Sequence, residues 1–268
     1  MKLLSGELIA QKIILQVGRN ISQLCLKPRL DILVCQNDPI SRIYLNKKKQ
    51  MAQKAGIEVV AHNVKNPDTN KYLALIDILN QDRAVNGILA QLPLPKNVDL
   101  KKIIWRIDGK KDVDGFQMKE FQPPTPAAII EILRYYNIAI AGKKIHILGR
   151  GFLVGKPLEI LLKKMGARVS ISDILIRKRE LIKNIKNAQI VVSAMGKSDV
   201  LKIEWFHKNQ IVIDAGTSVQ NGAQKGDVGQ QILEKVSAGT PTPGGVGPVS
   251  VACLTRNVYQ AAIKQMMR

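Results

Sequence analysis

A tyrosine and a lysine four residues apart could handle protons together. Tyr44 and Lys48 lie in the stretch D-P-I-S-R-I-Y-L-N-K-K-K (38–49), and residues four apart share one face of a helix. Ser41 is a good N-cap after the Asp-Pro turn, so we predict a helix over 41–55. A basic, solvent-exposed helix face would show the same spacing.

Polar groups also stand at the end of one predicted buried strand and in one predicted turn. Gln91 lies within N-G-I-L-A-Q-L-P-L-P (86–95), where the strand ends, and ligands bind at such ends in parallel sheets. Alone, it is also an ordinary polar strand end. The turn K-D-V-D-G-F (111–116) carries Asp112 and Asp114, whose strand-like spacing points them in opposite directions. We therefore expect one structural acid and one ligand-binding acid, rather than an acid/base pair.

A glycine-rich turn gives the strongest local pattern. A predicted strand at 143–148 leads into G-R-G-F-L-V-G (149–155), an amphipathic helix at 156–165 and a strand at 167–173. Glycines at a strand-to-helix turn let the backbone approach a phosphate at the helix N-terminus. The spacing is looser than the usual fingerprint, and an ordinary tight turn is the alternative. The candidate cofactor-binding residues here are Gly149, Arg150, Gly151 and Gly155.

Two later strands and a loop extend this pattern. The strands at 188–194 and 210–215 are both followed by glycine, and we assign Gly196 and Thr217 to the cofactor site. The segment A-G-T-P-T-P-G-G-V-G-P-V-S (238–250) would normally indicate a flexible loop. Its prolines stiffen the backbone and its glycines relax it at defined points, which suits a shaped ligand wall. Its candidate substrate-binding residues are Pro243, Gly244 and Gly245.

The remaining elements predict two α/β domains. Strands alternate with helices along the chain, which implies parallel sheets. Prolines near residue 123 favour a boundary there, giving an N-terminal catalytic domain at 1–122 and a Rossmann-type nucleotide-binding domain at 123–249, with a cleft between them. The final helix, within 250–268, is expected to pack back on the first domain. The other predicted helices and strands are 6–24, 30–35, 57–62 and 69–81.

The charge first suggests a nucleic-acid-binding protein. Lys plus Arg number 41 against 21 Asp plus Glu, a formal net charge of +20. The basic residues are scattered in short groups, and aromatic residues are only 4%, too few for base-stacking surfaces. We interpret the excess as general surface charge that attracts anionic small molecules, and we expect no specific nucleic-acid partner.

The composition argues against membrane insertion and metal chemistry. No apolar run reaches membrane-spanning length, and the N-terminal segment lacks the pattern of a signal peptide. The three cysteines and three histidines are isolated in the sequence, which fits a reducing compartment and no metal site. We expect a cytoplasmic protein.

Taken together, five segments resemble the methylenetetrahydrofolate dehydrogenase/methenyltetrahydrofolate cyclohydrolase family, nearly from end to end. The resemblance implies oxidation of 5,10-methylenetetrahydrofolate by NADP or NAD, followed by hydrolysis of the methenyl product to 10-formyltetrahydrofolate. It also implies a homodimer. The segments are D-P-I-S-R-I-Y-L-N-K-K-K, G-I-L-A-Q-L-P-L-P, K-D-V-D-G-F, G-R-G-F-L-V-G-K-P and P-T-P-G-G-V-G-P-V-S.

The resemblance also implies residue roles. Lys48 matches the family's essential lysine, and Tyr44 lies one turn before it. Gln91 matches the glutamine that orients that lysine, and Asp114 matches the acid that anchors the pterin. We expect burial, the neighbours Lys47 and Lys49, and a cationic intermediate to lower the pKa of Lys48 so that it can shuttle protons.

Three departures from the family pattern bear on the function. Gly151 replaces a common serine, and the segment from Phe116 to Pro123 is short, so a cyclohydrolase with weakened or lost dehydrogenase activity is the alternative function. Asp173 ends the second strand of the nucleotide domain, where family members often have His-Ser. An acid there accepts a ribose hydroxyl and repels a 2′-phosphate, so NADP is the family default and NAD the alternative.

Two other classes of protein would account for only part of this sequence. A basic nucleic-acid-binding protein would need none of the five segments. An amino-acid dehydrogenase with the same two-domain plan would leave Tyr44, Lys48 and Gln91 unexplained.

Overall fold

The chain forms two compact units. A computed structural model describes residues 1–35, 39–173, 176–220 and 223–267, with the backbone alone at 39–44, 219, 220 and 223. Unit 1 consists of Met1–Ala10 with Thr125–Ser250, and unit 2 of Gln11–Pro124 with Val251–Arg268.

The first ten residues, which the sequence pattern assigned to the N-terminal domain, lie in unit 1. Strand β1 (Lys2–Leu3) pairs in parallel with β11 (Ala238–Gly239) of that unit. The amide of Gly6 also donates a 2.8 Å hydrogen bond to the carbonyl of Gly244. The predicted domain bounds of 1–122 and 123–249 stay a prediction.

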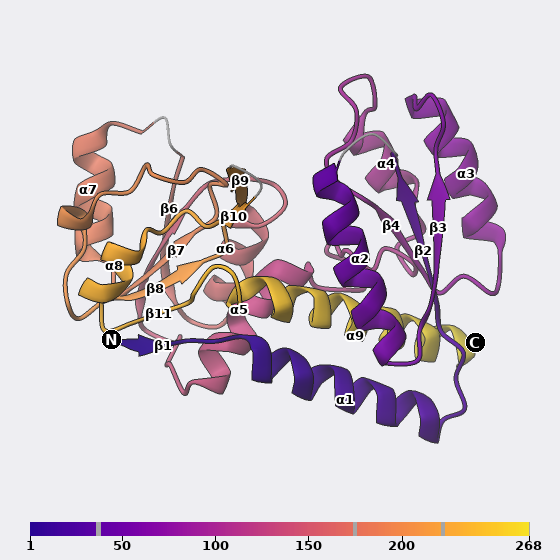
Figure 1. Cartoon of the computed structure of the whole chain (residues 1–268), viewed down its shortest axis with the longest axis horizontal. Helices are drawn as coiled ribbons and strands as arrows, with labels where there is room; N and C mark the ends of the chain where they lie inside the picture. The colour runs from indigo at the N-terminus through magenta and orange to yellow at the C-terminus, as the bar shows by residue number, and fades with distance from the viewer. Residues whose placement is uncertain (36–38, 174–175, 221–222, 268) are drawn as a thin grey trace. The chain divides into compact units, whose positions relative to one another are not determined.

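Unit 2 is built on a small parallel sheet. Its strands are β2 (Arg29–Val34), β3 (Glu58–Asn63) and β4 (Gly87–Ala90), in the order β3-β2-β4. Because β3 and β4 pair on opposite sides of β2, right-handed crossovers put their connecting helices on opposite faces. Figure 1 shows α2 (Pro39–Lys54) and α3 (Thr69–Gln81) on opposite sides of the strands. Unit 2 also holds α4 (Leu100–Arg106), most of α1 (Glu7–Gln23) and most of α9 (Val246–Met266).

The predicted elements of unit 2 are largely confirmed. The helices at 6–24 and 69–81 and the strands at 30–35 and 57–62 shift by no more than one residue. Ser41 is not the N-cap, because α2 already begins at Pro39, a residue that lacks an amide hydrogen and suits a first helical position. The buried strand predicted to end near Gln91 is β4, which ends at Ala90, before the prolines that cannot join a ladder.

Unit 1 is built on a six-stranded parallel sheet in the order β1-β11-β8-β7-β5-β6. Helices α7 and α8 lie on one side of the strands, and α5 and α6 on the other (Figure 1). The chain leaves β5 for β6 on one side and then crosses to β7 on the other, which makes β5/β7 the topological switch point. The bounds are β5 (Lys144–Leu148), β6 (Arg168–Ser172), β7 (Ile190–Ser193), β8 (Ile211–Asp214), α5 (Pro124–Tyr135), α6 (Gly155–Lys164), α7 (Lys178–Asn187) and α8 (Gln230–Lys235).

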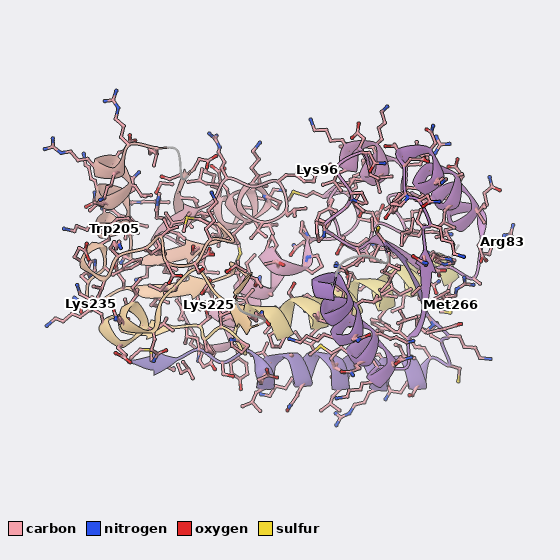
Figure 2. All side chains as sticks on the ribbon, turned by 45° about the horizontal axis from the view of Figure 1, so that its top comes forward. Arg83, Lys96, Trp205, Lys225, Lys235 and Met266 are labelled. Atoms are coloured by element: carbon pink, nitrogen blue, oxygen red, sulfur yellow. The ribbon has the colours of Figure 1, made fainter. Side chains whose placement is uncertain are left out.

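The short elements of unit 1 were not expected from the sequence. A two-stranded antiparallel pair, β9 (Ser218–Gln220) and β10 (Ala223–Lys225), follows β8. The 3-10 helix η1 (Ile203–Trp205) places Trp205, labelled in Figure 2, in the core. There it packs with residues of α7 and α8, among them Ile185 and Leu233.

The basic side chains are spread over the surface. Arg83, Lys96 and Lys235, labelled in Figure 2, are exposed and come from separate segments of the chain. Among the described residues, no helix is both long enough and apolar enough to span a membrane.

A buried lysine ties the turn at 111–116 to the rest of unit 2. The ammonium group of Lys111 donates hydrogen bonds of 2.7–2.9 Å to the backbone carbonyls of Leu79, Asn80 and Asp82. Leu79 and Asn80 lie in the last turn of α3, where carbonyls lack partners within the helix, and Asp82 is its C-cap. Burial is the main cause that lowers the pKa of Lys111. The lysine therefore caps the helix and holds the start of the turn.

We predict that Lys111→Met destabilises the protein by about 2 kcal/mol, because it leaves three helix-end carbonyls without their charged donor. Lys110→Met is the matched control, since Lys110 is exposed and its loss should change stability by no more than about 0.5 kcal/mol. Urea unfolding of both variants measures the difference. Equal stabilities would show that Lys111 has no capping role.

Candidate functional site

Lys48 and Gln91 meet in unit 2, although 43 residues separate them. Nζ of Lys48, on α2, donates a 3.0 Å hydrogen bond to Oε1 of Gln91, directly after β4. The amide nitrogen of Gln91 donates to the carbonyl of Leu92 at 2.8 Å. That second bond sets which end of the amide faces the lysine, because only the oxygen can accept from an ammonium group.

The backbone holds Gln91 in place. The backbone amide of Gln91 donates a 2.9 Å hydrogen bond to the carbonyl of Leu33 on β2. This bond continues the parallel ladder one residue beyond β4. The residue as a whole is 5% exposed. Gln91 is therefore a fixed acceptor at the carboxyl end of the sheet.

The two acids of the turn have different surroundings. Asp112 forms a parallel bridge with Ile88 of β4, and its Oδ2 accepts a 2.9 Å hydrogen bond from the amide of Gln117. Burial raises the pKa of Asp112 to about 6. Asp112 is therefore buried and hydrogen-bonded within its own turn. Asp114, by contrast, is only partly buried.

Asp114 and Lys48 influence each other electrostatically. Burial lowers the pKa of Lys48, and the charge of Asp114 raises it by less. Burial likewise raises the pKa of Asp114, and Lys48 opposes this. Burial, which the sequence predicted, is the larger cause at Lys48. Lys47 and Lys49, also expected to lower this pKa, have exposed side chains.

Tyr44 can be placed only in part. Its backbone lies in α2, one turn before Lys48, but its side chain is outside the described residues, as is all of Asp38. The proton-handling role of Tyr44 stays a prediction.

The glycine-rich turn lies at the switch point of unit 1. Gly149 has φ of +100°, and a Cβ there would lie 2.4 Å from the carbonyl oxygen of Ala194, after β7. A Cβ on Gly155 would lie 1.9 Å from the carbonyl oxygen of Gly149. No side chain fits either position, so the turn folds tightly against the start of α6. Val154, the N-cap, makes no side-chain capping bond, and the helix end can receive a phosphate.

The other predicted cofactor residues surround this turn. Gly196 follows β7, and a Cβ there would lie 3.7 Å from the carbonyl oxygen of Thr217, so these two segments are neighbours. Arg150 and Asp173 are exposed, and Asp173 directly follows β6. Gly151 has open space around its Cβ position, so packing does not exclude the serine that the family resemblance leads us to expect.

The predicted substrate residues of the last loop lie directly before α9. Pro243 is exposed, and Gly245 is buried. Gly244 has φ of +94°, and its carbonyl accepts from Gly6. These residues belong to unit 1, and the Lys48 group belongs to unit 2.

Among the described residues, no three His, Cys, Asp or Glu side chains gather as metal ligands. His146 is fully buried in β5, with Nδ1 2.8 Å from Oγ of Ser170. Burial lowers its pKa to about 4. The sequence pattern missed Lys111 and two further buried acids, Asp214 and Asp227. The only signal for these acids was their place beside glycine, in D-A-G and G-D-V-G.

The fold and the two groups of residues define an α/β enzyme with a glycine-rich turn at the switch point of one sheet and, in the other unit, a lysine whose pKa is lowered by burial. Residues 4–114 match the family described as tetrahydrofolate dehydrogenase/cyclohydrolase, catalytic domain, and residues 123–266 match its NAD(P)-binding domain. The chain belongs to the tetrahydrofolate dehydrogenase/cyclohydrolase family.

Relatives match over nearly the full length. The bifunctional protein FolD of Aquifex aeolicus is 36% identical, over 97% of this chain and 94% of the relative. A crystal structure of the bifunctional FolD dehydrogenase/cyclohydrolase from Campylobacter jejuni superposes with a TM-score of 0.92 at 31% identity, covering 98% and 99% of the two chains. The Trypanosoma brucei enzyme, solved with NADP cofactor and inhibitor, has a TM-score of 0.90 at 27% identity, covering 99% and 98%.

Proposed function

We propose that this chain oxidises 5,10-methylenetetrahydrofolate to the methenyl compound with NADP or NAD and then hydrolyses that product to 10-formyltetrahydrofolate. The observation that carries the proposal is the contact of Lys48 with Gln91 beside the charge of Asp114. The full-length match to the family supports it.

The dehydrogenase half uses the switch-point turn of unit 1. When bound, NAD(P) accepts a hydride from the methylene bridge of the folate. Gly149 and Gly155 allow the backbone to approach the dinucleotide phosphates, and the N-terminus of α6 contributes its partial positive charge. Arg150, Gly196 and Thr217 complete the proposed cofactor site.

The cyclohydrolase half uses Lys48. Water that attacks the methenyl carbon must lose a proton, and the ring nitrogen that leaves must gain one. A lysine with a lowered pKa has a larger neutral fraction and can perform the first transfer at neutral pH. Gln91 aims Nζ, and it contributes orientation rather than charge.

The pterin and the rest of the substrate need their own contacts. Asp114 can accept two parallel N–H donors from a pterin ring, as carboxylates do with bidentate donors. We assign Tyr44 and the segment Pro243–Gly245 to further substrate contacts. We also propose a homodimer, as the resemblance to the family implies, and a cytoplasmic location, as the isolated cysteines indicate.

The alternative function is a cyclohydrolase with weakened dehydrogenase activity. Gly151 favours it, because glycine supplies no hydroxyl at a position of the cofactor turn where the family resemblance leads us to expect serine. Separate measurements of methenyltetrahydrofolate and of reduced nicotinamide absorbance distinguish the two functions. Cofactor-dependent oxidation at a rate comparable to hydrolysis supports the bifunctional enzyme.

The cofactor is NADP by family default, and Asp173 makes NAD the alternative. The NADP-bound relative from Trypanosoma brucei supports the default. Asp173 directly follows β6, where an acid accepts the ribose hydroxyls of NAD and repels the 2′-phosphate of NADP.

We predict that Lys48→Met lowers the cyclohydrolase kcat by roughly 10²–10⁴-fold, the usual contribution of a proton-transfer group. Lys49→Met is the matched control, because Lys49 lies next to it in α2 with an exposed side chain, and it should keep most of the activity. Hydrolysis of supplied methenyltetrahydrofolate measures both. Normal turnover by Lys48→Met would refute the assigned role.

We predict that Asp173→Asn raises the ratio of kcat/KM for NADP to that for NAD by at least about tenfold, because it removes a negative charge beside the 2′-phosphate site. Asp199→Asn, an equivalent change at an exposed acid of the same unit, should leave the ratio unchanged. Steady-state rates with each cofactor provide the ratio. A strong NADP preference in the unaltered protein, or no shift in the variant, would contradict the role given to Asp173.

A further inference from the structure

Two fully buried acids stand behind the proposed cofactor turns. Asp214 ends β8 and is 2% exposed, and Asp227 is 1% exposed. We propose that Asp227, supported by Asp214, is a positioning residue that holds the turn at 195–197 in the shape that receives the nicotinamide dinucleotide. This inference rests on the proposed dehydrogenase function.

Asp227 accepts hydrogen bonds from a run of consecutive backbone amides. Successive N–H groups in a turn make a concavity that binds anions. Here the protein's own carboxylate occupies it, so the turn is fixed from behind rather than by a bound phosphate. The donors are Ser193 Oγ at 2.7 Å, Met195 N at 2.8 Å, Gly196 N at 3.3 Å and Lys197 N at 2.7 Å.

Asp214 in turn fixes the backbone that carries Asp227. Its Oδ1 accepts from the amides of Gly216 at 3.0 Å and Asp227 at 3.2 Å. Its Oδ2 accepts from the amide of Val228 at 3.0 Å. The two carboxylates therefore connect the segment after β7, the segment after β8 and the chain at 226–228.

Glycines occupy the two backbone positions, 216 and 226, that these carboxylates approach most closely. A Cβ on Gly216 would lie 2.0 Å from Cγ of Asp227, and a Cβ on Gly226 would lie 1.9 Å from Oδ2 of Asp214. Any side chain at either position would displace an acid from its amides. The glycines of D-A-G-T and G-D-V-G thus serve the carboxylates rather than a ligand.

The turn at 195–197 adjoins the proposed cofactor-binding residues. The Cβ position of Gly149 is 2.4 Å from the carbonyl oxygen of Ala194, one residue before the turn. Gly196, within the turn, has its Cβ position 3.7 Å from the carbonyl oxygen of Thr217. A shift of the turn would therefore move both segments at the switch point.

The acid pair is costly to bury. The pKa of Asp214 is raised to about 6, chiefly by burial and also by the charge of Asp227. Buried charges cost stability unless hydrogen bonds offset the lost water, and the amides at 195–197, 216 and 228 provide that offset. A pair of this kind suits a positional role better than a stabilising one.

The test uses Asp227→Asn in the full chain. Asparagine keeps the size but replaces an acceptor oxygen with an NH₂ group that faces amide donors. We expect the KM for NAD and for NADP to rise roughly tenfold to a hundredfold, as expected for losing charged hydrogen bonds. The kcat at saturating cofactor should change less than about threefold, and hydrolysis of supplied methenyltetrahydrofolate should stay normal, because Lys48 lies in unit 2.

Two further variants complete the experiment. Asp199→Asn is the matched control, since Asp199 is exposed, lies 4.0 Å from Lys225 (labelled in Figure 2), and has φ of +62°, which asparagine tolerates. It should behave as the unaltered protein does. Ser193→Ala removes one donor to Asp227 and should raise the cofactor KM by roughly threefold to tenfold, even if Asp227→Asn fails to fold.

The outcomes separate this inference from the proposed function. An unchanged cofactor KM in Asp227→Asn, or in Ser193→Ala if only that variant folds, overturns the positioning role. A parallel loss of both activities also overturns it, because that marks a merely structural residue. If the unaltered protein reduces neither cofactor, the dehydrogenase proposal fails. The positioning role of Asp227 is then tested by calorimetric titration of NAD and NADP into the unaltered protein and the variants. Weaker binding by the variants supports the inference, and equal or absent binding overturns it.

Discussion

The candidate site depends on the hydrogen bond between Lys48 and Gln91, because the ammonium group of Lys48 is partly shielded from water. An ammonium group in such a place needs a protein acceptor, and the 3.0 Å contact with the Gln91 oxygen provides one. Gln91 can do this because the ladder to Leu33 and the carbonyl of Leu92 hold both its backbone and its amide. The position of the lysine thus depends on the register of the β2–β4 pair.

The same sheet also places the negative partner of Lys48. The bridge between Ile88 and Asp112 extends the sheet by one short segment, and Lys111 anchors that segment to the end of α3. Asp114 follows two residues later and opposes the effect of burial on Lys48. Burial and the charge of Asp114 thus act on the pKa of Lys48 in opposite directions, and burial has the larger effect.

Much of the fold could be predicted from local pattern, because strands and helices here follow their hydrophobic periods and end at glycine or proline. The helix at 69–81 has the predicted bounds. The βαβ unit around the turn Gly149–Gly155 was also predicted from the sequence. Pairing across long separations was not predictable in this way. Lys2 pairs with Ala238 through a two-residue strand, which is too short to show a period.

In the candidate site, too, local patterns could be predicted from the sequence and contacts between distant residues could not. The pattern singled out Lys48 and Gln91 one at a time, but their partnership across 43 residues came only from the resemblance to the family. Asp227 was missed because its donors lie about 30 residues earlier in the chain. A buried acid that binds backbone amides leaves no side-chain motif, and the glycines beside it look like ordinary turn residues.

The most direct test of this mechanism is the titration of Lys48 itself. Nitrogen-15 NMR of the lysine Nζ groups, with the Lys48 signal assigned by its loss in Lys48→Met, follows its protonation in the resting enzyme. Burial should place the pKa of Lys48 below the ordinary value of 10.5, and the exposed Lys49 in the same helix provides the comparison. A pKa of Lys48 at or above that value would contradict its role as the proton-transfer group.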